Sequence, residues 1–167
     1  MSRAHEPPRS PSSAPEAVEA ARRFLEETAG RMGLALTVTA DVRDEEAVLE
    51  FVGPDAAVIV GRKGATLDAL QLLASRVASR ALQGERVALV VDADGWRAKR
   101  ERSLTKQAEQ LGAACVKTGK VIVMDPLPPR ERRVIHMALA RFPGVATRSE
   151  GGGEARRIQI IPMPAPR

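Results

Sequence analysis

Cysteine, histidine and aromatic residues are scarce in this chain of 167 residues, and each shortage excludes a class of function. The single cysteine, Cys115, cannot form an internal disulfide, which favours a reducing compartment and argues against a Cys-based zinc site. Two histidines that lie far apart in sequence exclude a His-rich metal centre. Aromatic residues make up only 2% of the chain, so a sheet covered with stacking rings is excluded as a platform for nucleic acid.

Long apolar runs are missing as well. The longest β-like stretch covers only residues 87–91, far short of the ~18 residues that a membrane helix needs. The N-terminus lacks the apolar segment of a secretory signal, so we expect a cytoplasmic protein without a membrane span. The chain does have 44% hydrophobic and 28% charged residues, which is enough for one or two globular domains with buried cores.

The net charge of +5 is unevenly distributed along the chain. Residues 1–92 contain 11 Lys and Arg against 14 Asp and Glu, a net charge of −3. Residues 93–167 contain 15 against 7, a net charge of +8. A basic second half is expected to attract phosphate, although an anionic membrane surface or an acidic protein would suit the same charge.

The first half of the chain predicts a Pro- and Ser-rich leader that does not pack, followed by an α+β domain. Apolar residues at helical spacing, alternating runs and glycine breaks predict its elements. The strand at 86–91 is nearly all apolar, so we expect it in the centre of a sheet. In order, we expect a leader (1–14), a helix (15–29), a hairpin (34–40 and 47–52), a short helix (55–60), a long helix (65–82) and this strand.

The second half predicts a smaller domain that begins at about residue 94. Its first helix has basic residues crowded near its N-terminus, where they oppose the helix dipole, so we expect these charges to serve another purpose. We expect a helix (97–117), a short strand (120–124), a helix (130–141), a terminal hairpin (145–149 and 156–161) and a tail (163–167).

A glycine motif, Gly61-Arg62-Lys63-Gly64, joins two of the predicted helices. Glycine has no Cβ, so a nucleic-acid backbone can come close, and the following helix offers free N–H groups to phosphate. Arg62 and Lys63 supply positive charge. A second GxxG at 30–33 lies between a helix and a strand, and we interpret it as an ordinary helix end.

These elements resemble a bacterial-type (type II) KH domain, in the order helix, strand, strand, helix, GxxG, helix, strand. The stretch Val60-Gly-Arg-Lys-Gly-Ala-Thr-Leu-Asp-Ala-Leu-Gln71 is similar to the KH core of the Jag family, also called SpoIIIJ-associated proteins. The resemblance implies a KH domain over residues 15–93 that binds single-stranded RNA through Gly61, Arg62, Lys63 and Gly64. Many Jag proteins carry a further small N-terminal domain and a charged linker. Here we expect only the short leader and carry over no property of that domain.

The second half contains Arg132-x-x-x-His136, two side chains on one face of a predicted helix. Together with the runs at 147–151 and 156–162, it resembles the R3H domain at the C-terminus of Jag proteins. The resemblance implies an R3H domain over residues 94–162 in which Arg132 and His136 contact nucleic acid. An arginine can fork onto a phosphate, and a histidine can donate to one or stack on a base.

Several other residues are candidates for a supporting role. Trp96 is expected to pack at the hinge between the domains or, alternatively, to offer a stacking surface. That stacking surface would lie beside the basic residues Arg97, Lys99 and Arg100. Arg133 points away from the Arg132 and His136 face and is expected to support the positive charge in general. The basic residues that could extend the patch, or could simply be solvated, are Arg130, Arg148, Arg156 and Arg157.

Motifs of other chemistries are absent from the sequence. There is no G-x-x-x-x-G-K-S/T phosphate loop and no G-x-S-x-G nucleophile elbow. Asp92 and Asp94 follow a strand and precede a glycine, which favours a turn over a metal site. We therefore expect neither enzymatic activity nor a cofactor.

The Jag resemblance further implies a post-transcriptional regulator linked to cell elongation and division or to sporulation, often acting beside a small protein made of a single KH domain. Two alternatives stay open. The acidic KH half could serve chiefly as a dimerisation or protein-interaction surface, with nucleic-acid binding weak or confined to the R3H half. Single-stranded DNA could also be the ligand, because the 2′-hydroxyl readout depends on geometry that the sequence does not give.

Overall fold

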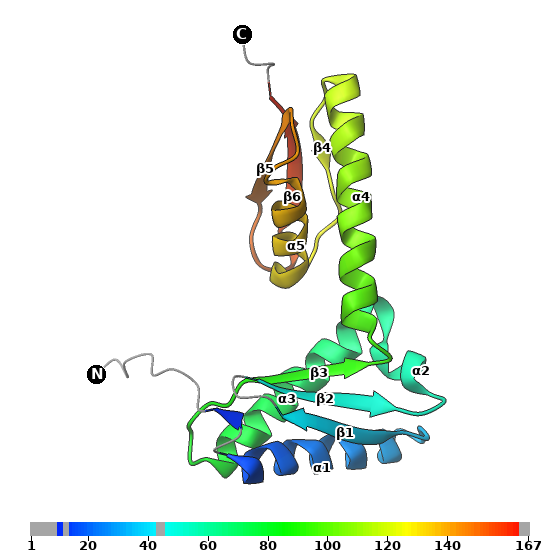
Figure 1. Ribbon diagram of the computed structural model, residues 1–167, viewed down its shortest axis with the longest axis vertical. Coiled ribbons are helices and arrows are strands. Elements are labelled where there is room, and N and C mark those ends of the chain that lie inside the picture. The colour runs from blue at the N-terminus through cyan, green and yellow to red at the C-terminus, as the bar shows by residue number, and fades with distance from the viewer. Residues whose placement is uncertain (1–9, 12–13, 43–45, 164–167) are drawn as a thin grey trace, which may run out of the picture. The chain divides into compact units, whose positions relative to one another are not determined.

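The computed structural model describes residues 10–11, 14–42 and 46–163, which form two compact units divided after Arg97 (Figure 1). Each unit has its own hydrophobic core. Most of the predicted leader lies outside the described residues. Two described residues of that stretch, Pro11 and Ala14, are buried, so packing begins before the first helix and not at Pro15 as expected. Among the described residues, no helix has the length and apolar character needed to cross a lipid bilayer.

The first unit has the predicted order of elements. Pro15 occupies the first turn of the first helix, where its missing N–H costs nothing. The elements are α1 (Pro15–Arg31), β1 (Thr37–Val42), β2 (Ala47–Val52), α2 (Ala56–Val60), a 3₁₀ turn (Arg62–Gly64), α3 (Ala65–Ala81) and β3 (Leu89–Ala93). This α-β-β-α-α-β order confirms the α+β fold predicted for the first half.

Helices α1 and α3 pack against each other and against one face of the three-stranded sheet (Figure 1). Each helix buries one stripe of its surface, for example Leu25 of α1 and Leu67 of α3. The strands alternate, so that Leu49 and Phe51 of β2 face the helices. Burial of these side chains is the main source of stability for the unit.

The expectation that the apolar strand at 86–91 lies in the centre of the sheet is wrong. The strand order is β1-β2-β3, with β2 antiparallel to β1 and parallel to β3, so β3 is an edge. Side chains complete the hydrogen bonds at its middle residue, Val91. The N–H of Val91 donates to Oε1 of Gln71 (3.2 Å), and its carbonyl accepts from Nε of Arg97 (2.7 Å). A strand can therefore be largely apolar and still lie at an edge, provided that side chains satisfy its backbone.

The second unit holds most of α4 (Trp96–Thr118), the helix within which the division between the units falls, and a three-stranded antiparallel sheet. The order of the sheet is β4-β6-β5, so the last strand of the chain is central. The proline pair before the second helix sets its start, as predicted. The remaining elements are β4 (Ile122–Val123), α5 (Pro129–Leu139), β5 (Val145–Glu150), a 3₁₀ turn (Gly153–Ala155) and β6 (Arg157–Pro162).

The core of the second unit forms where α4, α5 and the sheet meet. Leu104 of α4, Ile135 of α5 and Ile160 of β6 are all buried in one cluster. The thiol of Cys115 lies in the same cluster, 3.2 Å from the carbonyl oxygen of Lys120, and burial raises the pKa of this thiol.

Candidate nucleic-acid interface

The loop between α2 and α3 has an unusual backbone. Gly61, Lys63 and Gly64 all have positive φ, at 70°, 53° and 83°. Glycine adopts this region readily, but a residue with a Cβ such as Lys63 does so only when its surroundings hold it there. The side chains of Arg62 and Lys63 are exposed, and neither forms an ion pair with any residue that the structure describes. The loop thus presents two cations on a tightly folded backbone.

Neighbouring side chains leave no room for a Cβ at either of the two loop glycines. A Cβ at Gly61 would lie 2.8 Å from Cβ of Thr66, and a Cβ at Gly64 would lie 2.6 Å from Cζ3 of Trp96. From the sequence we expected the glycines only to admit a nucleic-acid backbone. The structure adds an internal reason, since each glycine allows a close approach between parts of the first unit.

Trp96 lies against the GxxG loop of the first unit. Its half-buried indole packs on the core of that unit, and its six-membered ring is the part nearest to Gly64. This contact uses part of the ring surface that stacking on a base would need. The hinge role expected for Trp96 stays a prediction.

The other GxxG, Gly30 to Gly33, ends α1. Gly33 has φ 75°, its N–H donates to the carbonyl of Gly30 (3.0 Å), and the N–H of Leu34 donates to the carbonyl of Ala29 (3.0 Å). This is the hydrogen bonding that closes a helix at a glycine. The interpretation of this motif as a helix end therefore agrees with its geometry.

Two of the supporting arginines have their guanidinium groups engaged within the protein, which corrects their expected role. The side chain of Arg97 is 9% exposed; it donates to Val91, as described above, and forms an ion pair with Asp68 (2.9 Å). Arg100 forms a two-pronged pair with the buried Glu131, at 2.7 and 2.9 Å, and this contact raises the pKa of Arg100. At these two positions, the basic residues near the start of α4 therefore form ion pairs within the protein.

The Arg132 and His136 pair lies on the side of α5 that faces β5. Nε of Arg132 donates to the carbonyl oxygen of Leu127 (3.1 Å), which fixes the direction of the guanidinium. Nδ1 of the exposed His136 lies 2.5 Å from Oγ1 of Thr147 on β5, a hydrogen bond that holds the ring in place. Both side chains are thus oriented by the second unit and reach its surface.

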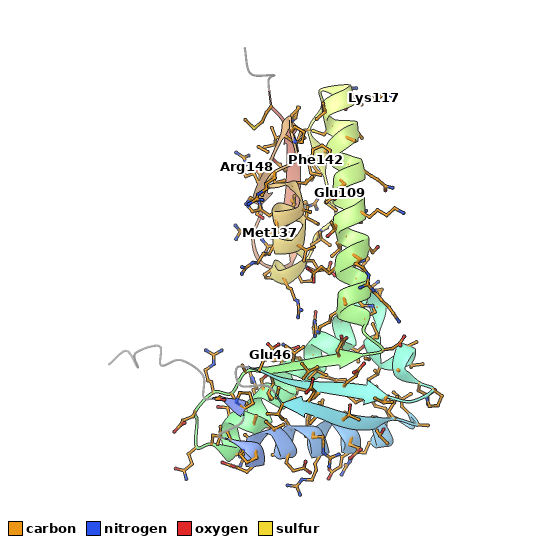
Figure 2. All side chains as sticks on the ribbon, viewed as in Figure 1. Glu46, Glu109, Lys117, Met137, Phe142 and Arg148 are labelled. Atoms are coloured by element: carbon orange, nitrogen blue, oxygen red, sulfur yellow. The ribbon has the colours of Figure 1, made fainter. Side chains whose placement is uncertain are left out.

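The remaining basic candidates lie on several different elements. Arg133 lies on the other side of α5, where it lines a shallow groove of about 300 Å³ together with Arg130 and the exposed Met137. Figure 2 labels Met137 on α5 and Arg148 on β5. Nη2 of Arg148 lies 3.5 Å from Oε2 of Glu150. The candidates Lys99, Arg156 and Arg157 are also exposed.

Sequence reasoning missed three residues that shape these sites. Thr66 borders Gly61, Glu131 binds Arg100, and Thr147 holds His136. Of the three, Thr147 is the easiest to recognise as a residue with a role, because it is polar and its position on β5 pairs with the buried Ile160. A polar side chain on the inner face of a strand needs a partner, and His136 provides it.

Comparison with known proteins identifies both units. A family model for the KH domain of KhpA/KhpB matches residues 19–91, and a model for the R3H domain matches residues 102–162. A protein named RNA-binding protein KhpB from Bacillus subtilis (strain 168) is 30% identical over 145 residues, which cover 86% of this chain and 69% of that protein. The chain belongs to the KhpB family. The predicted KH and R3H domains and the Jag resemblance are thereby confirmed.

Two further KhpB relatives match over a similar part of the chain. The RNA-binding protein KhpB of Clostridium symbiosum is 29% identical over 82% of this chain and 62% of its own length. That of Lactiplantibacillus plantarum is 31% identical over 86% of this chain and 44% of its own length. The chain therefore spans between about two fifths and seven tenths of the KhpB proteins that it matches.

Proposed function

We propose that this chain binds single-stranded RNA, with the GxxG loop of its KH domain as the clamp. The observation that supports this function is the loop itself. Two glycines bracket Arg62 and Lys63, which are exposed and have no ion pair among the described residues. A single strand can lie along such a backbone while the cations attract its phosphates. The names of the KhpB relatives agree with this function.

The R3H domain adds a second contact through Arg132 and His136. The free N–H groups of the Arg132 guanidinium suit a phosphate, and the exposed ring of His136 suits a phosphate or a base. Because both domains belong to one chain, the second contact with the same RNA is intramolecular, and its high effective concentration strengthens binding.

The wider role follows from the Jag resemblance. The chain acts in the cytoplasm, without catalysis, as a post-transcriptional regulator linked to cell elongation and division or to sporulation. A small protein made of a single KH domain is its expected partner.

Binding to short labelled single-stranded RNA, measured across a salt series, tests the function. Charge reversal with Arg62→Asp/Lys63→Asp is expected to lower the affinity about tenfold or more, because it replaces attraction to phosphate with repulsion. The matched control is Arg76→Asp/Arg80→Asp, which makes the same charge change on exposed positions of α3. Unchanged affinity in the loop variant, with its circular dichroism intact, would remove the GxxG clamp.

The same series resolves the R3H contact and the kind of nucleic acid. Arg132→Ala/His136→Ala is expected to weaken RNA binding, whereas Lys117→Ala/Lys120→Ala, two exposed cations of the same unit, serves as its control. A matched DNA strand is the competitor. Equal affinity for DNA and RNA would replace RNA by single-stranded nucleic acid in general.

A second candidate function is protein interaction by the KH domain. Leu72 and Leu73 of α3 are 56% and 47% exposed, an apolar pair in the half of the chain that has a net charge of −3. If the loop variant binds RNA normally, this surface becomes the favoured site, with a second KH domain as the occupant. Sedimentation of wild type and Leu72→Glu/Leu73→Glu would then show whether the pair mediates association.

A further inference from the structure

Trp96 is the only tryptophan of the chain, and it lies directly against the GxxG loop. The three heavy atoms nearest to a Cβ built on Gly64 all belong to the six-membered ring of this indole. Gly64 is itself buried, so the ring and the backbone of the loop are in close contact. The side chain is half-buried and packs on the core of the first unit.

Neighbouring groups fix the position of the indole. The next residue, Arg97, donates to the side chains of Asp68 and Gln71, both at 2.9 Å. Asp68 and Gln71 lie in the first two turns of α3, the helix that begins directly after the loop. Oδ1 of Asp92 accepts the N–H groups of Ala93 (2.8 Å) and Arg97 (3.2 Å), which closes the turn that leads to Trp96. The indole is thus held in register with the loop.

The backbone of the loop needs such support. Lys63 has φ 53°, a conformation that side chains with a Cβ disfavour and that persists only where the surrounding structure imposes it. Gly64, the next residue, also has left-handed backbone. The Trp96 ring contacts the loop at this point, between the two proposed RNA-binding cations and the start of α3.

We infer that Trp96 is a positioning residue for the RNA clamp: its indole holds Gly64, and through it Lys63, in the backbone shape that accepts a single strand. This inference rests on the proposed function. It assigns Trp96 a role that acts through the backbone of the loop, and it explains why the loop ends in a glycine even apart from any ligand.

Substitutions at Trp96 test the role by RNA affinity. Trp96→Ala is expected to lower the affinity about tenfold, the change that corresponds to 1.4 kcal/mol, whereas Trp96→Phe keeps an aromatic ring and most of the affinity. Trp96→Leu takes the place of Trp96→Ala if the alanine variant does not fold. The control is Phe24→Ala, which removes another partly buried ring from the same core. It is expected to lower stability and to leave RNA affinity unchanged.

Coupling between Trp96 and Gly64 separates positioning from general packing. In wild type, Gly64→Ala brings a Cβ into the space of the indole. In the Trp96→Ala background that space is free, so Gly64→Ala is expected to lower RNA affinity less there than it does in wild type. Gly61→Ala meets Thr66 instead, and its effect is expected to be the same in both backgrounds. Fluorescence of the single tryptophan is expected to shift when RNA is added to wild type.

The Arg62→Asp/Lys63→Asp variant tells the two possible failures apart. If it loses RNA affinity while Trp96→Ala and Trp96→Leu do not, the clamp stands and the positioning role is overturned. If it retains full affinity, the clamp fails and the positioning role fails with it. If the effects of Gly64→Ala and Trp96→Ala on RNA affinity are additive, the inference is also overturned. The indole and Gly64 would then influence RNA binding independently of each other.

Discussion

The KH and R3H domains carry positive charge in different ways. Residues 1–92 have a net charge of −3, and the two cations proposed to bind RNA, Arg62 and Lys63, stand on a short loop with left-handed backbone. Residues 93–167 have a net charge of +8, yet three arginines there donate to acceptors within the domain. We infer that backbone shape dominates recognition in the first domain and that the number and direction of cations dominate in the second.

The largest expected effect tests whether the two cores are separate. Glu131→Gln removes the charge that pairs with Arg100, whose side chain is 24% exposed. Breaking a buried pair from one side costs about 3–5 kcal/mol, and the remaining exposure reduces this to about 2–3 kcal/mol here. The chain has one tryptophan and no tyrosine, so fluorescence follows unfolding of the first unit, whereas circular dichroism follows both.

The expected result in urea is an earlier transition by circular dichroism and an unchanged transition by fluorescence. Glu109→Gln, an exposed acid on α4, should change neither. A fluorescence transition that moves together with the dichroism signal would show that the two units unfold as one.

The next effect separates shape from charge in RNA binding. Arg62→Gln/Lys63→Gln is expected to flatten the dependence of log affinity on log salt by about 1.4 units at most, since each phosphate contact with a single strand contributes about 0.7. Gly64→Ala is expected to lower affinity at every salt concentration with little change of slope, because it distorts the loop and removes no charge. Equal slopes for wild type and the glutamine variant would contradict this division.

The element order of both domains could be predicted from the sequence because periodicity and breakers such as Pro15 and Gly61 act locally. The place of β3 in its sheet could not. An apolar run has the same sequence pattern in the centre of a sheet and at its edge. The edge position of β3 depends on hydrogen bonds between the backbone of Val91 and the side chains of Gln71 and Arg97, which lie elsewhere in the sequence.

The proposed site shows the same limit. Gly61 to Gly64 and Arg132 with His136 were recognisable as motifs, but the partners that shape them come from distant positions. Trp96 follows Gly64 by 32 residues in the sequence and Thr147 follows His136 by 11. Arg97 and Arg100 were misjudged because a guanidinium that binds Asp68 or Glu131 has the same sequence signature as one that binds phosphate.

A smaller effect concerns the orientation of His136 in the R3H domain. Thr147→Val keeps the shape of the side chain and removes the hydroxyl that bonds to Nδ1. Loss of one such hydrogen bond is expected to weaken RNA binding by about threefold, because the ring is no longer held toward the surface. Ser149→Ala, on the same face of β5, is the control. Normal affinity in Thr147→Val together with weak binding in His136→Ala would show that the orientation of the ring is unimportant.

The smallest effect contrasts the exposed pairs of the KH domain with the Arg100–Glu131 pair of the R3H domain. On α1, a hydrogen bond from Arg22 lowers the pKa of Glu19, whose side chain is 50% exposed. A lowered pKa adds stability at neutral pH that is lost as the pH falls through that lowered value, where Glu19 takes up a proton. Water screens the pair with Glu19, and Nη1 of Arg22 also donates to Glu26 (2.8 Å) and to the carbonyl oxygen of Val38 (3.4 Å). Arg22→Gln should therefore lower the free energy of unfolding only a little, through the loss of these partly exposed contacts. The Arg22→Gln substitution is nevertheless expected to raise the pKa of Glu19 toward its ordinary value, as an NMR titration of the carboxyl carbon would show.

The control is Arg23→Gln. Nε of Arg23 lies 3.9 Å from the same carboxylate, so this substitution should move the pKa of Glu19 less. A loss of stability as large as that of Glu131→Gln would mean that exposed and buried pairs contribute alike, and the contrast between the domains would fail.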